Sequence, residues 1–140
     1  MTSSPPFRAL PACLLVFASC TTVGVNYEEQ PYAIVEPTIA YEMILDNKQI
    51  VVLDIRPVEE FYGQLGHIAG ALSVPIQKID SRIGEIMPYR SQTVLVYGDA
   101  QEEVVQAIET LNAAGFRNLV LIRGGIRRWI DLGYKTVKGI

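Results

Sequence analysis

Cysteine and histidine are scarce in this sequence. Of 140 residues only two are cysteines, Cys13 and Cys20, and one is a histidine, His67. Both cysteines lie near the amino terminus, so a disulfide framework is excluded for the remainder of the chain. A lone histidine on a turn is far more often structural than catalytic or metal-binding. We therefore expect no metal site and no cofactor.

Basic side chains are also few and dispersed. The chain has 12 Lys and Arg against 15 Asp and Glu, a net charge of -3, and no basic cluster able to neutralise several phosphates. Nucleic acid is therefore not an expected partner. With 49% hydrophobic and 19% charged residues, the composition is that of a globular chain long enough for one domain.

Long apolar runs are missing as well. The stretch from Ala9 to Ser19 is almost uninterrupted, but it is roughly half of the ~20 residues that a membrane-spanning helix needs. A stretch of this length is typical of the apolar region of a signal peptide. The segment ends Phe17-Ala18-Ser19-Cys20, which resembles the bacterial lipobox, in which the cysteine is diacylated and becomes the mature amino terminus.

This pattern predicts a signal peptide over residues 1–19, a lipid attached at Cys20, a tether over 20–31 and one domain over 32–140. The protein would then be anchored in the cell envelope and face the periplasm. Thr21 after the cysteine favours the outer membrane over the inner one. The alternative is an ordinary secretory signal that leaves a soluble periplasmic protein.

Short apolar runs alternate with helical patterns in the expected domain. Runs that are apolar at every position suit strands buried on both faces, which indicates a mainly parallel sheet. We predict a single three-layer α/β domain, with a five-stranded sheet and helices on both faces. The strands are expected at 33–35, 50–55, 73–74, 93–97 and 118–122, and the helices at 38–46, 79–86, 101–114 and from 125 to about 132.

Three sequence blocks, in this order and spacing, resemble the signatures of the rhodanese-like, or sulfurtransferase homology, domain family. They are Val52-Leu53-Asp54-Ile55-Arg56 followed by Glu59-Glu60-Phe61 and Gly66-His67-Ile68-Ala69-Gly70-Ala71; the strand Val94 to Tyr97 with a six-residue loop and a helix ending Ala113-Ala114-Gly115-Phe116; and Leu121-Ile122-Arg123-Gly124-Gly125-Ile126-Arg127-Arg128-Trp129. The resemblance implies a rhodanese-like fold for nearly the whole expected domain.

The residue after the central strand differs from that of active family members. The resemblance places there a cysteine that receives sulfur as a persulfide within a cradle of backbone N–H groups, but this chain has Gly98. Glycine has no thiolate to attack or to carry sulfur. Related phosphatases use a cysteine and an arginine across the same cradle, where this chain has Gly98 and Val104. The sequence thus predicts a catalytically inactive member.

The loop that follows the central strand is acidic. It reads Gly98, Asp99, Ala100, Gln101, Glu102 and Glu103, and its carboxylates would repel an anion such as thiosulfate. Asp99 followed three residues later by Glu102 fits a capping box, which predicts that Asp99 caps the next helix. The degenerate loop would then be a structural cap.

Other candidate site residues also have simpler structural interpretations. Asp54 and Arg56 end a strand where open parallel sheets bind ligands, yet a salt bridge from Arg56 to Glu59 or Glu60 is the favoured interpretation. Arg123 is expected to pair with Glu102 or Glu103, with ligand binding as a secondary role. Trp129 is expected in the core.

Taken together, these features predict a non-catalytic rhodanese-like module held at the bacterial envelope. It would bind an unknown protein or small ligand through the loop around Gly98. The alternative is a component of sulfur transfer that acts with a thiol on a partner protein.

Overall fold

The computed structural model describes residues 29–139. The predicted signal peptide, the lipid attachment at Cys20 and most of the predicted tether lie outside these residues. Within them, no helix is long and apolar enough to span a membrane.

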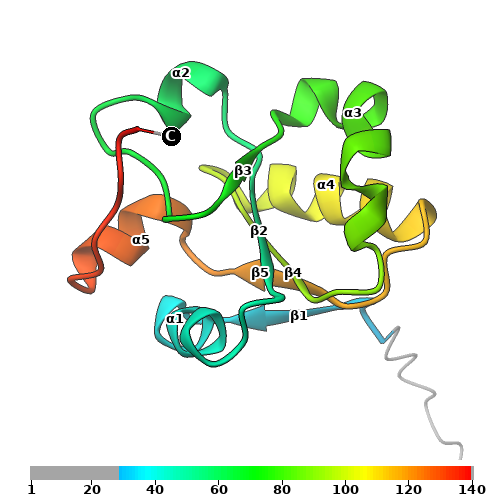
Figure 1. Ribbon diagram of the computed structural model, residues 1–140, viewed down its shortest axis with the longest axis horizontal. Coiled ribbons are helices and arrows are strands. Elements are labelled where there is room, and N and C mark those ends of the chain that lie inside the picture. Colours follow the sequence, from blue (N-terminus) through cyan, green and yellow to red (C-terminus); the bar gives the residue numbers. More distant parts are fainter. Residues whose placement is uncertain (1–28, 140) are drawn as a thin grey trace, which may run out of the picture.

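Five parallel strands form one sheet in the order β1-β5-β4-β2-β3 (Figure 1). Every residue of β2, β4 and β5 is buried, as expected for strands covered on both faces. The predicted five-stranded parallel sheet is therefore confirmed. The strands are β1 (Tyr32–Val35), β2 (Val51–Asp54), β3 (Leu72–Ser73), β4 (Val94–Tyr97) and β5 (Leu119–Ile122).

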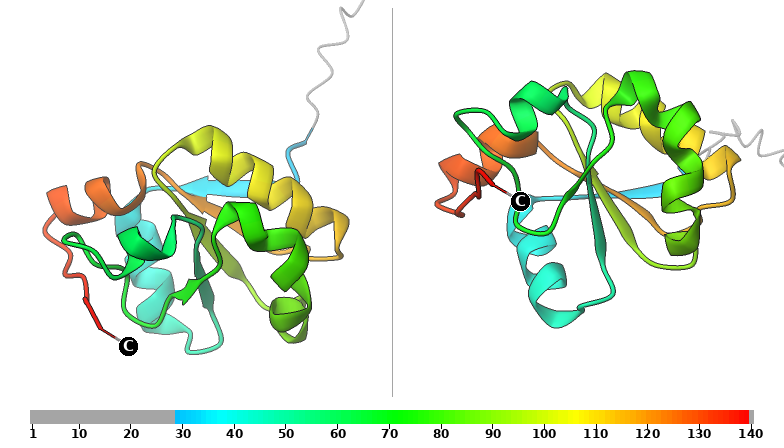
Figure 2. Two further views of the ribbon diagram at one scale, coloured as in Figure 1. Left: turned by 90° about the horizontal axis from the view of Figure 1, so that it is seen from above. Right: turned by 45° about the horizontal axis from the view of Figure 1, so that its top comes forward.

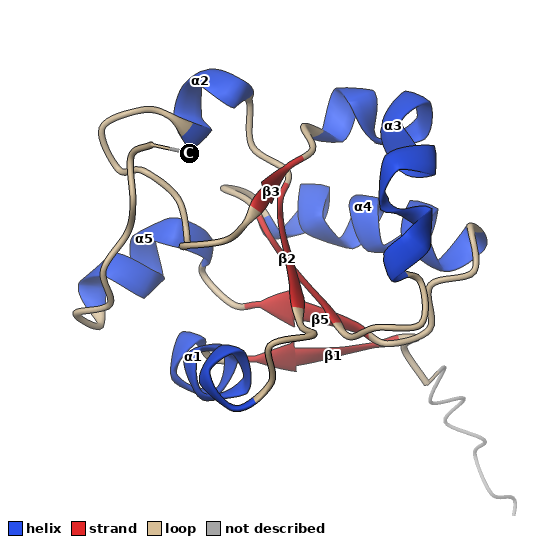
Figure 3. Cartoon of the chain, viewed as in Figure 1, coloured by secondary structure: helices blue, strands red, loops and turns tan. Residues whose placement is uncertain are grey.

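Helices cover both faces of this sheet, which confirms the predicted three layers (Figures 2 and 3). On one face, α3 and α4 pack against alternate strand residues such as Leu53 and Val96. On the other face, α1 and α5 pack against the intervening residues such as Val52 and Leu95. The helices are α1 (Pro37–Asp46), α2 (Val58–Phe61), α3 (Ile79–Ile86), α4 (Gln101–Ala113) and α5 (Gly125–Asp131).

Helix boundaries follow local backbone chemistry. The predicted N-cap of α1, Thr38, is wrong, because the cap residue is Glu36, two residues earlier, and Pro37 is the first residue of the helix. Proline suits that position, where its missing N–H would have had no helical acceptor. At the end of α4, Gly115 has a φ of 103°, the left-handed conformation that commonly terminates a helix.

Candidate functional site

The predicted active-site loop lies at the carboxyl end of the sheet, between β4 and α4. Its extent differs from the prediction: Gly98 to Ala100 form the connection, whereas Gln101 to Glu103 are already the first turn of α4. The amide of Val104 donates to the carbonyl of Ala100, the normal helical bond. The connection is therefore three residues long and not six, because half of the predicted loop is wound into the helix.

Hydrophobic side chains fill the space beside Gly98. A Cβ atom at this position would lie 2.9 Å from Ile55 Cγ1 and 3.2 Å from Val104 Cγ2. Both side chains are buried in the core between the sheet and α4. On another side, Gly125 approaches so closely that its own Cβ would overlap the carbonyl oxygen of Gly98. The cavity that includes Gly98 and Asp99 has a volume of about 110 Å³.

The expected capping box is wrong. The cap residue of α4 is Ala100, whose extended backbone (φ -106°, ψ 131°) suits the position but whose side chain makes no capping hydrogen bond in the described structure. Asp99 therefore lies one residue too early. Glu102 and Glu103 still place negative charge in the first turn, where the helix dipole favours it.

Asp54 and Arg56 form a buried ion pair with each other. Arg56 Nη2 lies 2.7 Å from Asp54 Oδ2 and donates a second 2.7 Å hydrogen bond to the carbonyl of Gly66, while Arg56 Nε donates to Asp54 Oδ1 at 3.0 Å. The predicted pairing of Arg56 with Glu59 or Glu60 is therefore wrong, because the guanidinium turns back along its own strand end. The pair ties β2 to the loop before His67.

Burial and the neighbouring charge shift the pKa of Arg56 in opposite directions. Burial lowers the pKa of Arg56, but the hydrogen bond and the charge of Asp54 outweigh burial, so the pKa is raised above the ordinary value. Burial, followed by the charge of Asp54, also raises the pKa of the Tyr97 phenol. Tyr97 is therefore a neutral group, and its hydroxyl accepts a 3.1 Å hydrogen bond from the amide of Ile68. These three residues hold the strand ends and the following loop together.

Arg123 pairs with Glu36 and not with the acidic first turn of α4. Arg123 Nη1 lies 3.3 Å from Glu36 Oε1, and Arg128 Nε lies 2.7 Å from Glu36 Oε2. The predicted partners Glu102 and Glu103 are wrong because β5 lies beside β1, whose end is followed by Glu36. All of these pairs are partly exposed, so each contributes little to stability.

His67 and Trp129 are both buried, which confirms the expected core position of Trp129. His67 is 3% exposed, its ring stacks on Phe61 with centroids 3.6 Å apart, and its Nδ1 lies 2.8 Å from the carbonyl oxygen of Phe61. Trp129 is also 3% exposed, and its Nε1 donates to the carbonyl of Lys135 at 3.0 Å. Among residues 29–139, no group of three His, Cys, Asp or Glu side chains is placed to hold a metal ion.

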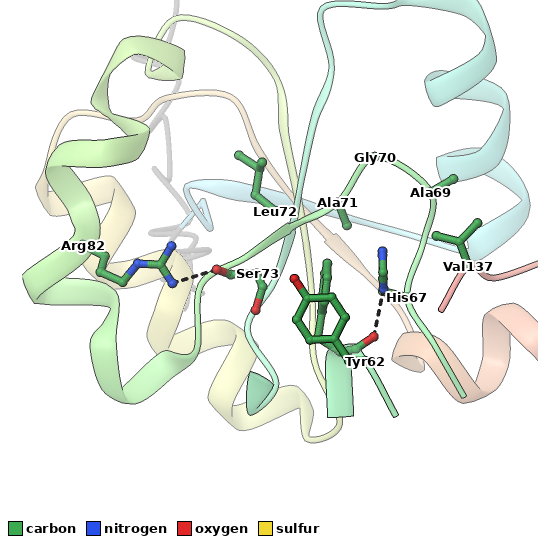
Figure 4. A pocket seen from close by; sticks show the side chains of 10 residues that line it. Tyr62, His67, Ala69, Gly70, Ala71, Leu72, Ser73, Arg82 and Val137 are labelled. Atoms are coloured by element: carbon green, nitrogen blue, oxygen red, sulfur yellow. Dashed lines mark hydrogen bonds between the residues drawn. The ribbon is translucent and has the colours of Figure 1, made fainter. Parts of the chain in front are cut away.

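A larger cavity, of about 560 Å³, lies beside the edge strand β3. Figure 4 shows its walls, which come from α2, the following loop, β3, α3 and the carboxyl-terminal segment. Sequence reasoning missed this site because most of its lining residues, between 61 and 73, were assigned only to a family block, and Arg82 and Val137 join them only through the fold. Three large apolar residues that remain exposed, Tyr62, Leu72 and Val137, mark the site in the structure. Only the fold brings them to one cavity.

Similarity to known proteins agrees with this fold. The chain is 32% identical over 87 residues to the thiosulfate sulfurtransferase PspE of Escherichia coli, covering 62% of this chain and 78% of that protein. It is 26% identical to the uncharacterized protein slr1261 of Synechocystis, covering 64% of this chain but only 48% of that protein.

A solved structure shows the same architecture. The rhodanese-related protein from Thermoplasma volcanium is 29% identical and superposes with a TM-score of 0.67, covering 77% of this chain and all of that one. Residues 36–132, well over half of the chain, match the family described as rhodanese-like domain. This chain therefore belongs to the rhodanese-like domain family.

Proposed function

We propose that this protein is a non-catalytic rhodanese-like binding module. The observation that carries the proposal is the filled space at Gly98. The position has no thiol, and a Cβ added there would lie 2.9 Å from Ile55 Cγ1 and 3.2 Å from Val104 Cγ2, so any side chain is obstructed. Sulfur transfer of the family type needs a thiolate at that position.

The electrostatics of the same end of the sheet support the proposal. Asp99 precedes α4, and Glu102 and Glu103 lie in its first turn with exposed side chains. Together these carboxylates disfavour the approach of an anionic sulfur donor. The cavity here, about 110 Å³, is below the ~300 to 1,000 Å³ typical of small-molecule sites. The loop around Gly98 is therefore better suited to surface contact with a partner protein than to enclosing a ligand.

The test is a thiosulfate-to-cyanide sulfurtransferase assay on the full chain, with thiocyanate as the readout and PspE as the positive control. We expect no thiocyanate above the uncatalysed background. Gly98→Cys is also expected to stay inactive, because the new side chain meets Ile55 and Val104. Turnover by the unmodified chain would overturn the proposal. Activity of Gly98→Cys alone would show instead that the site lacks nothing but its nucleophile.

We further propose that a lipid on Cys20 holds the module at the cell envelope, facing the periplasm. The support is the resemblance of the segment ending at Cys20 to a lipobox. We expect the protein in the membrane fraction, predominantly that of the outer membrane, and expect Cys20→Ser to remove it from that fraction because the acylated thiol is lost. Fractionation followed by immunoblotting measures this. A wild-type protein found wholly in the soluble periplasmic fraction would support the ordinary secretory signal instead.

A further inference from the structure

The cavity beside β3 has the size of a small-molecule site. Its volume of about 560 Å³ lies within the ~300 to 1,000 Å³ range of such sites. It is about five times the volume of the cavity at Gly98. None of its lining residues belongs to the loop at Gly98, so the two sites are distinct.

The walls of this cavity are fixed by interactions from several segments. His67 stacks on Phe61, and its backbone exchanges two 2.9 Å hydrogen bonds with Val137. Thr136 Oγ1 donates a 2.6 Å hydrogen bond to the carbonyl of Leu65. These contacts hold the carboxyl-terminal segment against the loop after α2. A ligand would therefore meet a largely preorganised wall, which reduces the entropy lost on binding.

The edge of β3 is closed to an additional strand. Arg82 Nη1 donates a 2.8 Å hydrogen bond to the carbonyl of Ser73, the group that an extended peptide would need as its acceptor. The strand itself has only two residues, Leu72 and Ser73. An occupant is therefore expected to enter the cavity as a compact group and not to lie along the sheet edge as a peptide.

One end of the cavity carries cationic and hydroxyl groups. Arg82 donates to Glu85 and to the Ser73 carbonyl, and its guanidinium retains further N–H groups. Ser73 Oγ is buried and has no hydrogen-bond partner within the described residues. The Arg82–Glu85 pair is bidentate but open to solvent, with 34% and 60% of the two side chains exposed, so solvent screens it. A ligand carboxylate can compete for the same guanidinium.

The other end offers an acceptor. Because the Phe61 carbonyl can only accept, His67 Nδ1 carries the proton of the neutral ring, which leaves Nε2 as an acceptor. Figure 4 shows Arg82 and His67 well separated, with Tyr62 between them. Tyr62, Leu72 and Val137 supply apolar walls, and they are 51%, 37% and 39% exposed. A cavity with apolar walls and a few polar groups has the composition of a small-molecule site.

We propose that this cavity binds a small aromatic carboxylate that carries a hydrogen-bond donor on the opposite side of its ring, with 4-hydroxybenzoate as the simplest example. The carboxylate would lie at Arg82, the ring between the apolar walls, and the hydroxyl would donate to His67 Nε2. The inference deepens the proposed binding function, because it names a site and a ligand class for the module.

The test is titration of the full chain with 4-hydroxybenzoate by calorimetry and by amide chemical shifts. We expect saturable binding with the largest shifts between residues 61 and 73. Benzoate lacks the donor and 4-hydroxybenzamide lacks the charge, so each is expected to bind about tenfold more weakly, since each loses one hydrogen-bonded group. Hexanoate tests the need for the ring and is expected to bind more weakly still.

Variants of the carboxylate end give a sharper test. Glu85→Gln removes the competing carboxylate and is expected to tighten binding several-fold, whereas Glu42→Gln on the remote helix α1 should leave it unchanged. Arg82→Gln is expected to weaken binding at least tenfold, because it removes the cation that lines the cavity. No saturable binding at millimolar ligand, or binding indifferent to both Glu85→Gln and Arg82→Gln, would overturn the inference. Sulfurtransferase turnover is measured in a separate assay, so failure of ligand binding does not contradict the non-catalytic proposal.

Discussion

At the scale of single residues, packing and not backbone strain keeps position 98 a glycine. Gly98 is absent from the described residues with a positive φ, so its backbone conformation is open to other amino acids. The obstacle is the contact that any Cβ would make with Ile55 and Val104. Position 98 is therefore part of a close-packed core in this protein.

Gly98→Ala is accordingly expected to destabilise the protein by about 1 to 3 kcal/mol, the usual cost of overpacking a core. The cost should be smaller in a Val104→Ala background, and denaturant unfolding in a double-mutant cycle measures this coupling. Gly84→Ala is the matched control, because within the described structure its added Cβ meets no atom within 4 Å. It lies in α3, where alanine favours the helix. Equal effects of the two substitutions would contradict the packing argument.

At the scale of elements, α4 starts without a side-chain cap. Ala100 holds the cap position with suitable backbone angles but no acceptor. Ala100→Ser is therefore expected to stabilise the protein by about 0.5 to 2 kcal/mol, since serine can accept from a first-turn amide. Asp99→Ala serves as the comparison and should change the unfolding midpoint little, because Asp99 precedes the cap. Thermal unfolding of both variants measures this, and a large loss with Asp99→Ala would restore the capping box.

The elements also show which features are predictable from sequence. The buried strands and α4 were predictable, because continuous apolar runs and helical spacing persist over many residues. The start of α4 at Gln101 was also predicted correctly, but its cap was not: Ala100 takes the position expected for Asp99, because a cap moves with a single residue. The partner of Arg123 depended on strand order: Glu36 becomes its neighbour only when β1 pairs with β5. Arg56 and Asp54 were placed correctly at the end of β2. Their pairing with each other was not predictable, because a sequence pattern does not show in which direction a side chain points.

At the scale of the whole molecule, the cavity beside β3 depends on contacts between the carboxyl-terminal segment and a loop in the middle of the chain. The carboxyl-terminal segment crosses the loop after α2 so closely that a Cβ on Gly66, which has a φ of 68°, would overlap the carbonyl oxygen of Val137. Glycine is needed there for its conformation and for space. No local pattern predicts such a crossing, because the segments that meet are about 70 residues apart. The fold therefore creates the cavity, and the family blocks alone do not.

Thr136→Val tests whether this crossing frames the cavity. Valine has nearly the same shape but cannot donate to Leu65, so we expect a loss of about 0.5 to 1.5 kcal/mol and faster hydrogen exchange at the amides of His67 and Val137. Thr110→Val is the control, since Thr110 also donates to a backbone carbonyl, but within α4 and away from the cavity. It should leave exchange at those two amides unchanged. If Thr136→Val also leaves their exchange unchanged, the segment is held by its backbone bonds alone, and the hydroxyl has no part in shaping the cavity.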